Sequence, residues 1–374
     1  MYPPIGEDDG PPPDAPAPFP SAVLPGDFQQ ALDKPFIRGL QTWLDDAAFE
    51  TKWTASLQSP IAFLGSADSA FHADLASRTL PLPGSEVICH GDAKLDNFGW
   101  IFEDSTISFS DGDFDDAGHC PAAADILHFI VATDLLFADP ALDRQAIDAY
   151  VAAASNWNDS IGIDPSTMPD FEALRNDGVD HATKDGKLKL GGDLVAVTSD
   201  ERTALTALVA AEARLPTTIY DMAREIRSDG GSAGLRRYWL FVLGLDSLRT
   251  IIELKELAPP GTELGWHSTP LVNRFGVLKR FWWGAFADTD HFEVTLLGGR
   301  FVARDRFRRQ SLDPEALSVA VRANAIQSEA SLLAIRHMTA WKGDLAPLRA
   351  WLETSSQTLI ARWREAYASA GGTN

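Results

Sequence analysis

Two acidic loops hold the residues whose types and spacing could do chemistry. They read His90-Gly-Asp92-Ala-Lys94-Leu-Asp-Asn97 and Asp111-Gly-Asp113-Phe-Asp115-Asp116. Phosphoryl transfer from ATP needs a carboxylate that accepts the hydroxyl proton, oxygen ligands for Mg²⁺, and a cation near the γ-phosphate. In this interpretation Asp92 is the base and Lys94 is the cation. Asn97 and Asp113 would then be the metal ligands.

A glycine-rich segment far downstream could cover the triphosphate. It reads Gly230-Gly231-Ser232-Ala233-Gly234. Such a loop lets backbone N–H groups approach phosphate oxygens, because its side chains are absent or small. Lys255 comes at the end of the second of two predicted strands, 240–244 and 250–254, and would reach the α- and β-phosphates. We therefore expect Lys255 and Asp113 to converge on one cleft.

Each of these features also has a structural interpretation. Asp92 and Asn97 could cap the backbone of a loop. The spacing of Asp111, Asp113 and Asp115 is also similar to a calcium loop, but an EF-hand needs Gly and Glu where this chain has Asp116 and Ala122. The glycine-rich segment could be a linker, and Lys255 a surface residue of a strand. His90 and Asp125 are expected to be structural, with Asp125 capping a helix and bracing the first loop.

The loops resemble those of known phosphotransferases. His90-Gly-Asp92 and Asn97, followed by Asp113 and Asp125, are similar to the catalytic segment of aminoglycoside and choline phosphotransferases of the protein-kinase-like superfamily. A closer resemblance is to a bacterial family known as domain of unknown function 2252. The matching segments are Gly91–Gly99, Gly112–Asp116, Pro121 with Asp125, Gly230–Gly234, and Leu254–Leu257. The resemblance extends from about residue 50 to about 310. Lys94, Gly112 and Leu257 depart from the family's usual His, Asn and Ala.

The order of these motifs predicts the architecture. Only 89 residues precede His90, which is too few for the five-stranded lobe that kinases place first. We therefore predict an α+β, protein-kinase-like fold of two lobes that is circularly permuted. The expected parts are a disordered tail (1–27), a helical catalytic domain (28–225), a β-rich nucleotide domain (226–310) and C-terminal helices that return to the catalytic domain (311–374).

Local patterns predict the individual elements. Strands are expected at 86–90 and 106–110, and hairpins at 184–187 and 291–304. Helices are expected at 122–138, 201–227 and 272–287. Kinases orient their lysine with a glutamate, and the sequence leaves Glu253, Glu256 and Glu263 as candidates.

Composition narrows the possible partners and location. Lys and Arg number 32 against 53 Asp and Glu, which gives a net charge of −21 and argues against broad nucleic-acid binding. We expect no membrane segment and no secretory signal. Cys89 and Cys120 are expected to be buried small residues in a cytoplasmic protein, without a disulfide framework. The nine prolines in residues 1–27 predict the extended tail. Oligomeric state is not indicated.

Together these features predict an ATP- and Mg²⁺-dependent phosphotransferase. Its acceptor would be a hydroxyl of a small molecule, because the loop resembles those of metabolite kinases, and the acidic composition hints at a cationic one. Two alternatives stay open. The chain could be a nucleotide-binding pseudokinase or scaffold without activity, or it could transfer the nucleotidyl group on the same fold.

Overall fold

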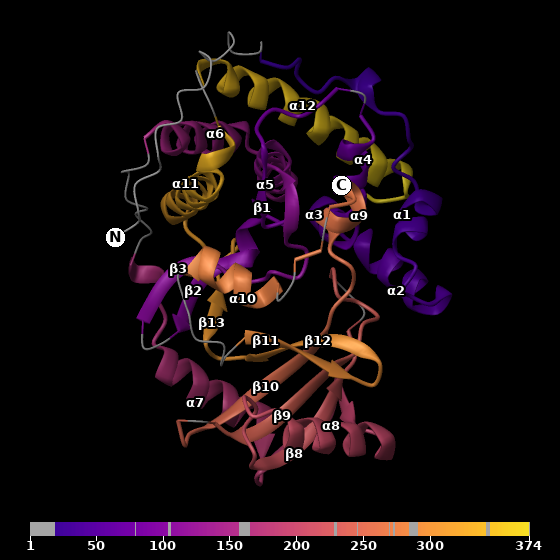
Figure 1. Cartoon of the computed structure of the whole chain (residues 1–374), viewed down its shortest axis with the longest axis vertical. Coiled ribbons are helices and arrows are strands. Elements are labelled where there is room, and N and C mark those ends of the chain that lie inside the picture. Colours follow the sequence, from indigo (N-terminus) through magenta and orange to yellow (C-terminus); the bar gives the residue numbers. More distant parts are fainter. Residues whose placement is uncertain are drawn as a thin grey trace, which may run out of the picture.

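The structure is a computed structural model of the whole chain. The residues that it describes are 19–78, 80–103, 106–156, 165–227, 230–244, 246–268, 270–271, 274–283, 291–341 and 345–373. In Figure 1 a mostly helical part lies above a twisted sheet, with short strands and the helix α10 between them. The arrangement confirms an α+β protein, with helices and antiparallel strands in separate layers.

The sheet has six antiparallel strands in the order β11-β12-β10-β9-β8-β7. Their bounds are β7 (Leu194–Ala196), β8 (Ile219–Glu225), β9 (Arg237–Leu243), β10 (Arg249–Glu256), β11 (His291–Leu296) and β12 (Gly299–Asp305). The pairing of β9 with β10, and the β11–β12 hairpin that turns at Leu297 and Gly298, confirm the strands expected there.

Alternation along the strands gives the sheet two different faces. One face carries apolar residues such as Leu240 and Leu254, which pack on Leu205 and Val209 of α8 (Ser199–Ala211). The opposite face carries charged residues. Glu253 and Lys255 lie on β10, where Glu253 is paired in register with Arg304 of β12. The charged face is the one directed towards the acidic loops, because Lys255 contacts Asp113 there.

The helical part surrounds one buried helix, α5 (Ala122–Phe137), in which every residue from Ala122 to Leu135 is buried. The helices of this part are α1 (Lys34–Leu40), α2 (Asp46–Ser56), α3 (Pro60–Ser66), α4 (Asp68–Ala76), α6 (Pro140–Ser155), α11 (Val319–Arg336) and α12 (Ala346–Ser369). α11 packs along α6, and α12 packs across α3, α5 and α6. The last helices of the chain therefore complete the layer that its first helices begin.

Short antiparallel strands hold the two acidic loops. β1 (Glu86–Cys89) pairs with β4 (Gly118–Pro121). β2 (Phe98–Glu103) pairs with β3 (Thr106–Asp111) and with β13 (Arg309–Ser311). The first loop connects β1 to β2 and the second connects β3 to β4, so the strand pairs bring the two loops together.

Smaller elements complete the described chain. They are η1 (Pro25–Asp27), η2 (Leu95–Asn97), η3 (Pro165–Thr167), α7 (Phe171–Ala182), β5 (Thr183–Lys184), β6 (Lys187–Leu188), α9 (Gly261–Trp266), α10 (Arg274–Leu278), the π-helical turn η4 (Lys279–Trp283) and η5 (Met338–Ala340). The expected hairpin at 184–187 is confirmed as β5–β6. The helix expected at 272–287 is described only between residues 274 and 283.

The prediction of one helix over 201–227 is wrong. α8 ends at Ala211, and residues 219–225 form β8. Pro216 cannot donate a helical hydrogen bond, and the Thr217–Tyr220 segment after it favours a strand. Because β7 and β8 belong to the sheet, the β-rich part begins well before the boundary predicted at residue 226.

The prediction of a disordered tail over residues 1–27 is wrong for residues 19–27. Residues 1–18 lie outside the described part, but residues 19–27 pack against the molecule. Val23 is fully buried, and its backbone N–H donates to Ser355 Oγ of α12 at 3.0 Å. Phe19 lies edge-on to Trp351. Proline favours an extended backbone, and Phe19 and Val23, which lie between the prolines, attach this segment to α12.

Cys89 and Cys120 are both buried, as predicted, but the expectation that they are unpaired is wrong, because they form a disulfide. They lie on the paired strands β1 and β4, a proximity that their separation of 31 residues did not indicate. Disulfides persist mainly in oxidising compartments, so the bond weighs against the cytoplasmic location, which stays a prediction. Among the described helices, none has the length and apolar character needed to cross a bilayer.

Candidate functional site

The first loop is fixed in place by buried ionic groups. The carboxylate of Asp125, on α5, accepts the backbone N–H groups of His90 at 2.8 Å and Gly91 at 3.0 Å. His90 Nε2 lies 2.6 Å from Asp111 Oδ1, and both side chains are fully buried. Burial alone would lower the pKa of His90, but the Asp111 carboxylate outweighs it and raises the pKa to about 9. Asp125 therefore braces the loop, as expected, although it lies within the helix rather than at its cap.

Asp92 is held at the tip of this loop by two donors. Its Oδ2 accepts Lys94 Nζ at 2.6 Å and Asn97 Nδ2 at 2.9 Å. Burial would raise the pKa of Asp92, but the Lys94 ammonium holds it below its usual range. Asn97 Nδ2 also donates to the backbone oxygen of Asp92 at 2.7 Å, so the amide oxygen is the group that Asn97 could offer to a metal ion.

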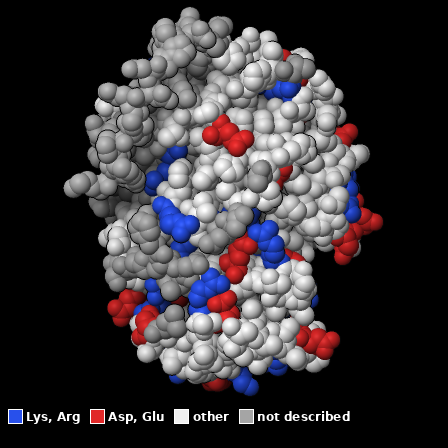
Figure 2. Space-filling view, viewed as in Figure 1, with Lys and Arg blue, Asp and Glu red and all other residues white. Residues whose placement is uncertain are grey.

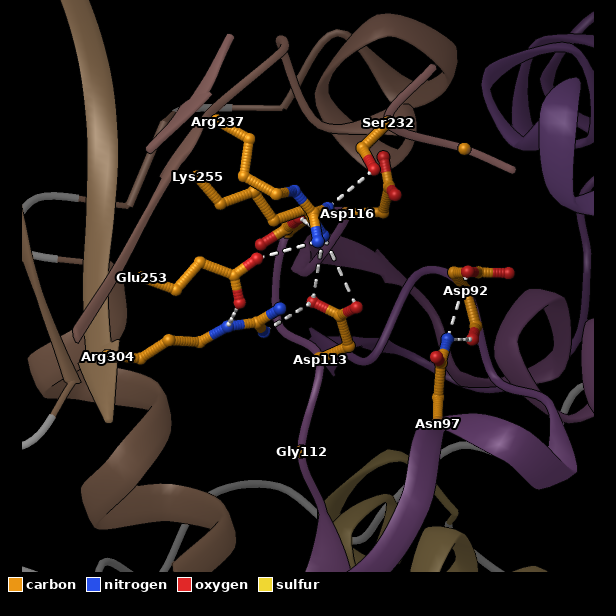
Figure 3. A network of polar contacts seen from close by, with 12 residues as sticks. Asp92, Asn97, Gly112, Asp113, Asp116, Ser232, Arg237, Glu253, Lys255 and Arg304 are labelled. Atoms are coloured by element: carbon orange, nitrogen blue, oxygen red, sulfur yellow. Dashed lines mark hydrogen bonds and ion pairs between the residues drawn. The ribbon is translucent and has the colours of Figure 1, made fainter. Parts of the chain in front are cut away.

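Lys255 reaches across from the sheet to the second loop. Its Nζ lies 3.3 Å from both carboxylate oxygens of Asp113 and also pairs with Asp115 (Figure 3). Arg304 Nη1 lies 3.6 Å from Asp113 Oδ1. Burial would raise the pKa of Asp113, but these cations hold it well below its usual range. The two stretches of chain, 142 residues apart, therefore meet at one point.

Among the described residues, the ion-pair partners of Lys255 are Asp113 and Asp115 rather than a glutamate. Glu253 pairs with Arg237 Nη1 at 2.6 Å and with Arg304 Nε at 3.0 Å. Glu256 pairs with Arg236. Two of the three candidate glutamates are thus paired with arginines, and Lys255 is paired with two aspartates of the second acidic loop.

The glycine-rich segment lies partly at the site. Gly230, Gly231 and Ser232 line the same cavity as Asp92 and Lys255. The Gly231 carbonyl accepts Lys52 Nζ of α2 at 2.7 Å, and Ser232 Oγ accepts Arg237 Nη2 at 2.8 Å. Gly234 is not among the lining residues. Its φ of +81° favours glycine, and an added Cβ would press on Leu44 and Ala48 of α2.

One cavity of about 230 Å³ connects these groups. The lining residues that carry charge are Lys52, Asp68, Asp92, Lys94, Asp96, Asp113, Asp115, Asp116, Arg227, Arg237, Lys255 and Arg304. Six of them are acidic and six are basic, so the cavity does not share the acidity of the whole chain. Figure 2 shows positive and negative side chains gathered between the helical part and the sheet.

Sequence reasoning missed several of the lining residues. Burial lowers the pKa of Lys52 to about 8, and burial together with Asp92 raises the pKa of Asp116 to about 6. Asp116 Oδ1 accepts the backbone N–H of Gly261 at 2.9 Å. Asp116 stands in the second acidic loop, where the sequence allowed Asp115 and Asp116 to be either further metal ligands or part of a solvated turn. Lys52 lies within the helix α2, where no local signal marks it.

Asp68, Asp92 and His128 form a second group with ligand character, whose ligand atoms all lie within 4.8 Å of one another. His128 Nε2 is 3.0 Å from Asp68 Oδ1 and 3.8 Å from Asp92 Oδ1. Its other ring nitrogen lies 2.9 Å from the Ala93 carbonyl, which orients the ring. This set could bind a divalent ion, but one proton shared by Asp68 and His128 would satisfy the closest pair equally well.

Comparison with known proteins covers only part of the chain. Residues 44–164 match a family described as "Uncharacterized protein conserved in bacteria (DUF2252)". This match contains both acidic loops and ends before the glycine-rich segment and Lys255. No curated protein and no solved structure matches the chain. The resemblance to the DUF2252 family is therefore supported over the part of the chain that contains the two acidic loops.

Proposed function

We propose that the protein is an ATP- and Mg²⁺-dependent phosphotransferase that acts on a hydroxyl group of a small molecule. The observation that carries this proposal is the meeting of Lys255 with Asp113 in the cavity that also contains Asp92 and Asn97. A base, two oxygen ligands and a phosphate-binding cation thus share one space, as phosphoryl transfer requires.

The architecture supports the same proposal. A β-rich part carries the lysine and the glycine-rich segment, and a helical part carries the loops, with the site between them. Protein kinases distribute these groups between a β-rich and a helical part in the same way, but in this chain the β-rich part follows the catalytic loop. We therefore infer a circularly permuted kinase-like fold.

Asp92 would accept the proton of the acceptor hydroxyl as its oxygen bonds to the γ-phosphorus and the bond to the departing ADP oxygen breaks. Lys94 and Asn97 hold the Asp92 carboxylate in one orientation and keep it ionised. Lys255, close to Asp113, would neutralise phosphate oxygens, and Lys94 would do so on the side of the acceptor.

The carboxylate of Asp113 and the amide oxygen of Asn97 are the hard oxygen ligands that suit Mg²⁺. A low pKa keeps Asp113 ionised and ready to bind a cation. When bound there, the ion would neutralise charge on the phosphates. The residues present therefore fit the metal that the reaction needs.

The test is ATP turnover with a panel of small hydroxyl compounds, followed by the Asp92→Asn variant. Loss of a general base should lower kcat by about 10²–10⁴-fold while nucleotide binding persists in calorimetry. The control is Asp200→Asn, in the exposed first turn of α8, which should keep full activity. Full activity in Asp92→Asn would refute the assignment of the base.

The engagement of Lys255 by two aspartates favours a second candidate, a nucleotide-binding protein without transfer activity. That candidate predicts nucleotide binding that depends on Lys255 but no product with any acceptor. Mass spectrometry of the products also separates phosphorylation from nucleotidyl transfer by the mass added to the acceptor.

A further inference from the structure

A second cavity of about 230 Å³ lies beside the candidate active site. Its lining contains six arginines, Arg227, Arg237, Arg304, Arg306, Arg308 and Arg309. Two carboxylates, Glu253 and Asp305, are the acidic residues of this lining. Such a concentration of positive charge is unexpected in a chain whose net charge is −21.

The fold explains how these arginines meet. Arg237 on β9 and Arg304 on β12 lie on the charged face of the sheet, on either side of β10. Arg306 and Arg308 follow β12 at the same alternation as Arg304, in the segment that leads to β13. Arg309 begins β13, where it donates to the Gly112 carbonyl beside Asp113.

The carboxylates that pair with these arginines are shared among them, and Glu225, outside the lining, lies 3.4, 3.6 and 3.9 Å from Arg227, Arg237 and Arg306. Glu253 is shared by Arg237, Arg304 and Arg306, at 2.6, 3.0 and 3.4 Å. Within the described part of the chain, His291 Nε2 is buried without a hydrogen-bond partner, and Arg304 Nη1 makes no hydrogen bond although it lies 3.6 Å from Asp113 Oδ1; both residues line the cavity. Burial lowers the pKa of Arg306 even though Glu253 opposes it. These groups are arranged to receive further negative charge.

We propose that this cavity binds an oxyanionic group, a phosphate or a carboxylate, carried by the acceptor substrate. Arginine forks match the planar, paired oxygens of such groups. Lys255 and Asp113 line the first cavity and not this one, so the nucleotide phosphates belong to the first cavity. Arg227, Arg237 and Arg304 line both, which places the two ligands side by side.

That the bound oxyanion belongs to the phosphoryl acceptor rests on the proposed function. The acceptor is then a hydroxyl compound that carries an anionic group. The acidic composition of the chain had hinted at a cationic one. The charge of the cavity lining is the better guide to the charge of the ligand, because a bound ligand interacts with nearby groups rather than with the net charge of the chain.

The experiment measures binding of inorganic phosphate and pyrophosphate to the full chain by calorimetry, without any turnover. The cavity variant is Arg306→Gln with Arg308→Gln, whose side chains are 28% and 26% exposed, so that folding should persist. The control is Arg300→Gln, an exposed arginine of β12 outside the cavity. We expect the variant to bind at least tenfold more weakly and the control to bind as the natural protein does. If the double variant does not fold, as judged by circular dichroism, the Arg308→Gln variant replaces it.

The same titration in the presence of saturating ADP and Mg²⁺ separates the two sources of the oxyanion. Unchanged phosphate binding supports a separate acceptor site. Displacement of phosphate by ADP overturns that assignment and gives the cavity to the nucleotide. Absence of phosphate and pyrophosphate binding, or equal binding by the cavity variant, overturns the anion site itself. None of these results depends on catalysis, so an inactive protein does not confuse them.

Discussion

Asp125 connects the stability of the molecule to the position of the first acidic loop. Its fully buried carboxylate accepts two backbone N–H groups, and one of its oxygens lies 3.1 Å from His337 Nε2. In Asp125→Asn one carboxylate oxygen becomes an amide that cannot accept, so a buried donor loses its partner. Such a loss costs about 1–3 kcal/mol, and loss of the charge weakens the other contacts. We expect the free energy of unfolding to fall by about 3–5 kcal/mol at pH 7.

Urea unfolding followed by circular dichroism measures this change, and its pH dependence adds a second criterion. Burial would raise the pKa of Asp125, but the His337 contact holds it below its usual range. Because the pKa of Asp125 is lower in the folded state than in the unfolded chain, the ionised carboxylate stabilises the folded protein above about pH 4. This stabilisation is lost as the pH falls further. The difference between natural protein and variant should therefore shrink below about pH 4. Asp148→Asn, an exposed partner of Arg349, is the control and should change little. A loss below about 1 kcal/mol in Asp125→Asn would contradict the bracing role.

Three other perturbations test neighbouring parts of the site. Gly91→Ala should destabilise the protein by more than about 2 kcal/mol in urea unfolding, because φ is +89° and the added Cβ would collide with the Asp116 carbonyl; an unchanged midpoint would contradict this geometry. The raised pKa of His90, about 9, should stabilise the fold fully below about pH 6.5 and progressively less towards pH 9. His90→Gln should remove that slope from the unfolding profile, and a slope that persists would assign it to another group. Lys255→Met should weaken Mg²⁺–ATP binding at least tenfold in calorimetry. The control Lys189→Met, on an exposed hairpin, should bind Mg²⁺–ATP as the natural protein does. Equal affinity in the two variants would exclude Lys255 from the nucleotide site.

The part of the site that the sequence revealed is the part that lies in short contiguous loops. Asp92, Asn97 and Asp113 could be proposed because their types and spacing fit the needs of phosphoryl transfer, and because the loops resemble those of known phosphotransferases. Lys255 could be connected to them through the order of the motifs, and the structure confirms the contact with Asp113. Local patterns also predicted the strands and hairpins around these loops.

The rest of the site depends on convergence that no local pattern reports. Lys52 and Asp68 come from helices, and Arg304 comes from a hairpin, so each resembles any other surface residue in sequence. The helix expected at 201–227 failed because its apolar spacing continued beyond Pro216, and the partner strand β9 that selects a strand there lies further along the chain. The disulfide was missed for the same reason, since only the pairing of β1 with β4 brings the two sulfur atoms together.

Lys52 of α2, which donates to the Gly231 carbonyl of the glycine-rich segment, also offers a site for chemical labelling. With a pKa of about 8, Lys52 carries a substantial neutral fraction at mildly alkaline pH, whereas ordinary lysines stay protonated there. Amine-directed reagents attack the neutral form, so limited acylation should label this position early wherever the reagent can enter. The rate of that labelling, followed by peptide mass mapping, would then report directly whether a compound fills the space in front of it.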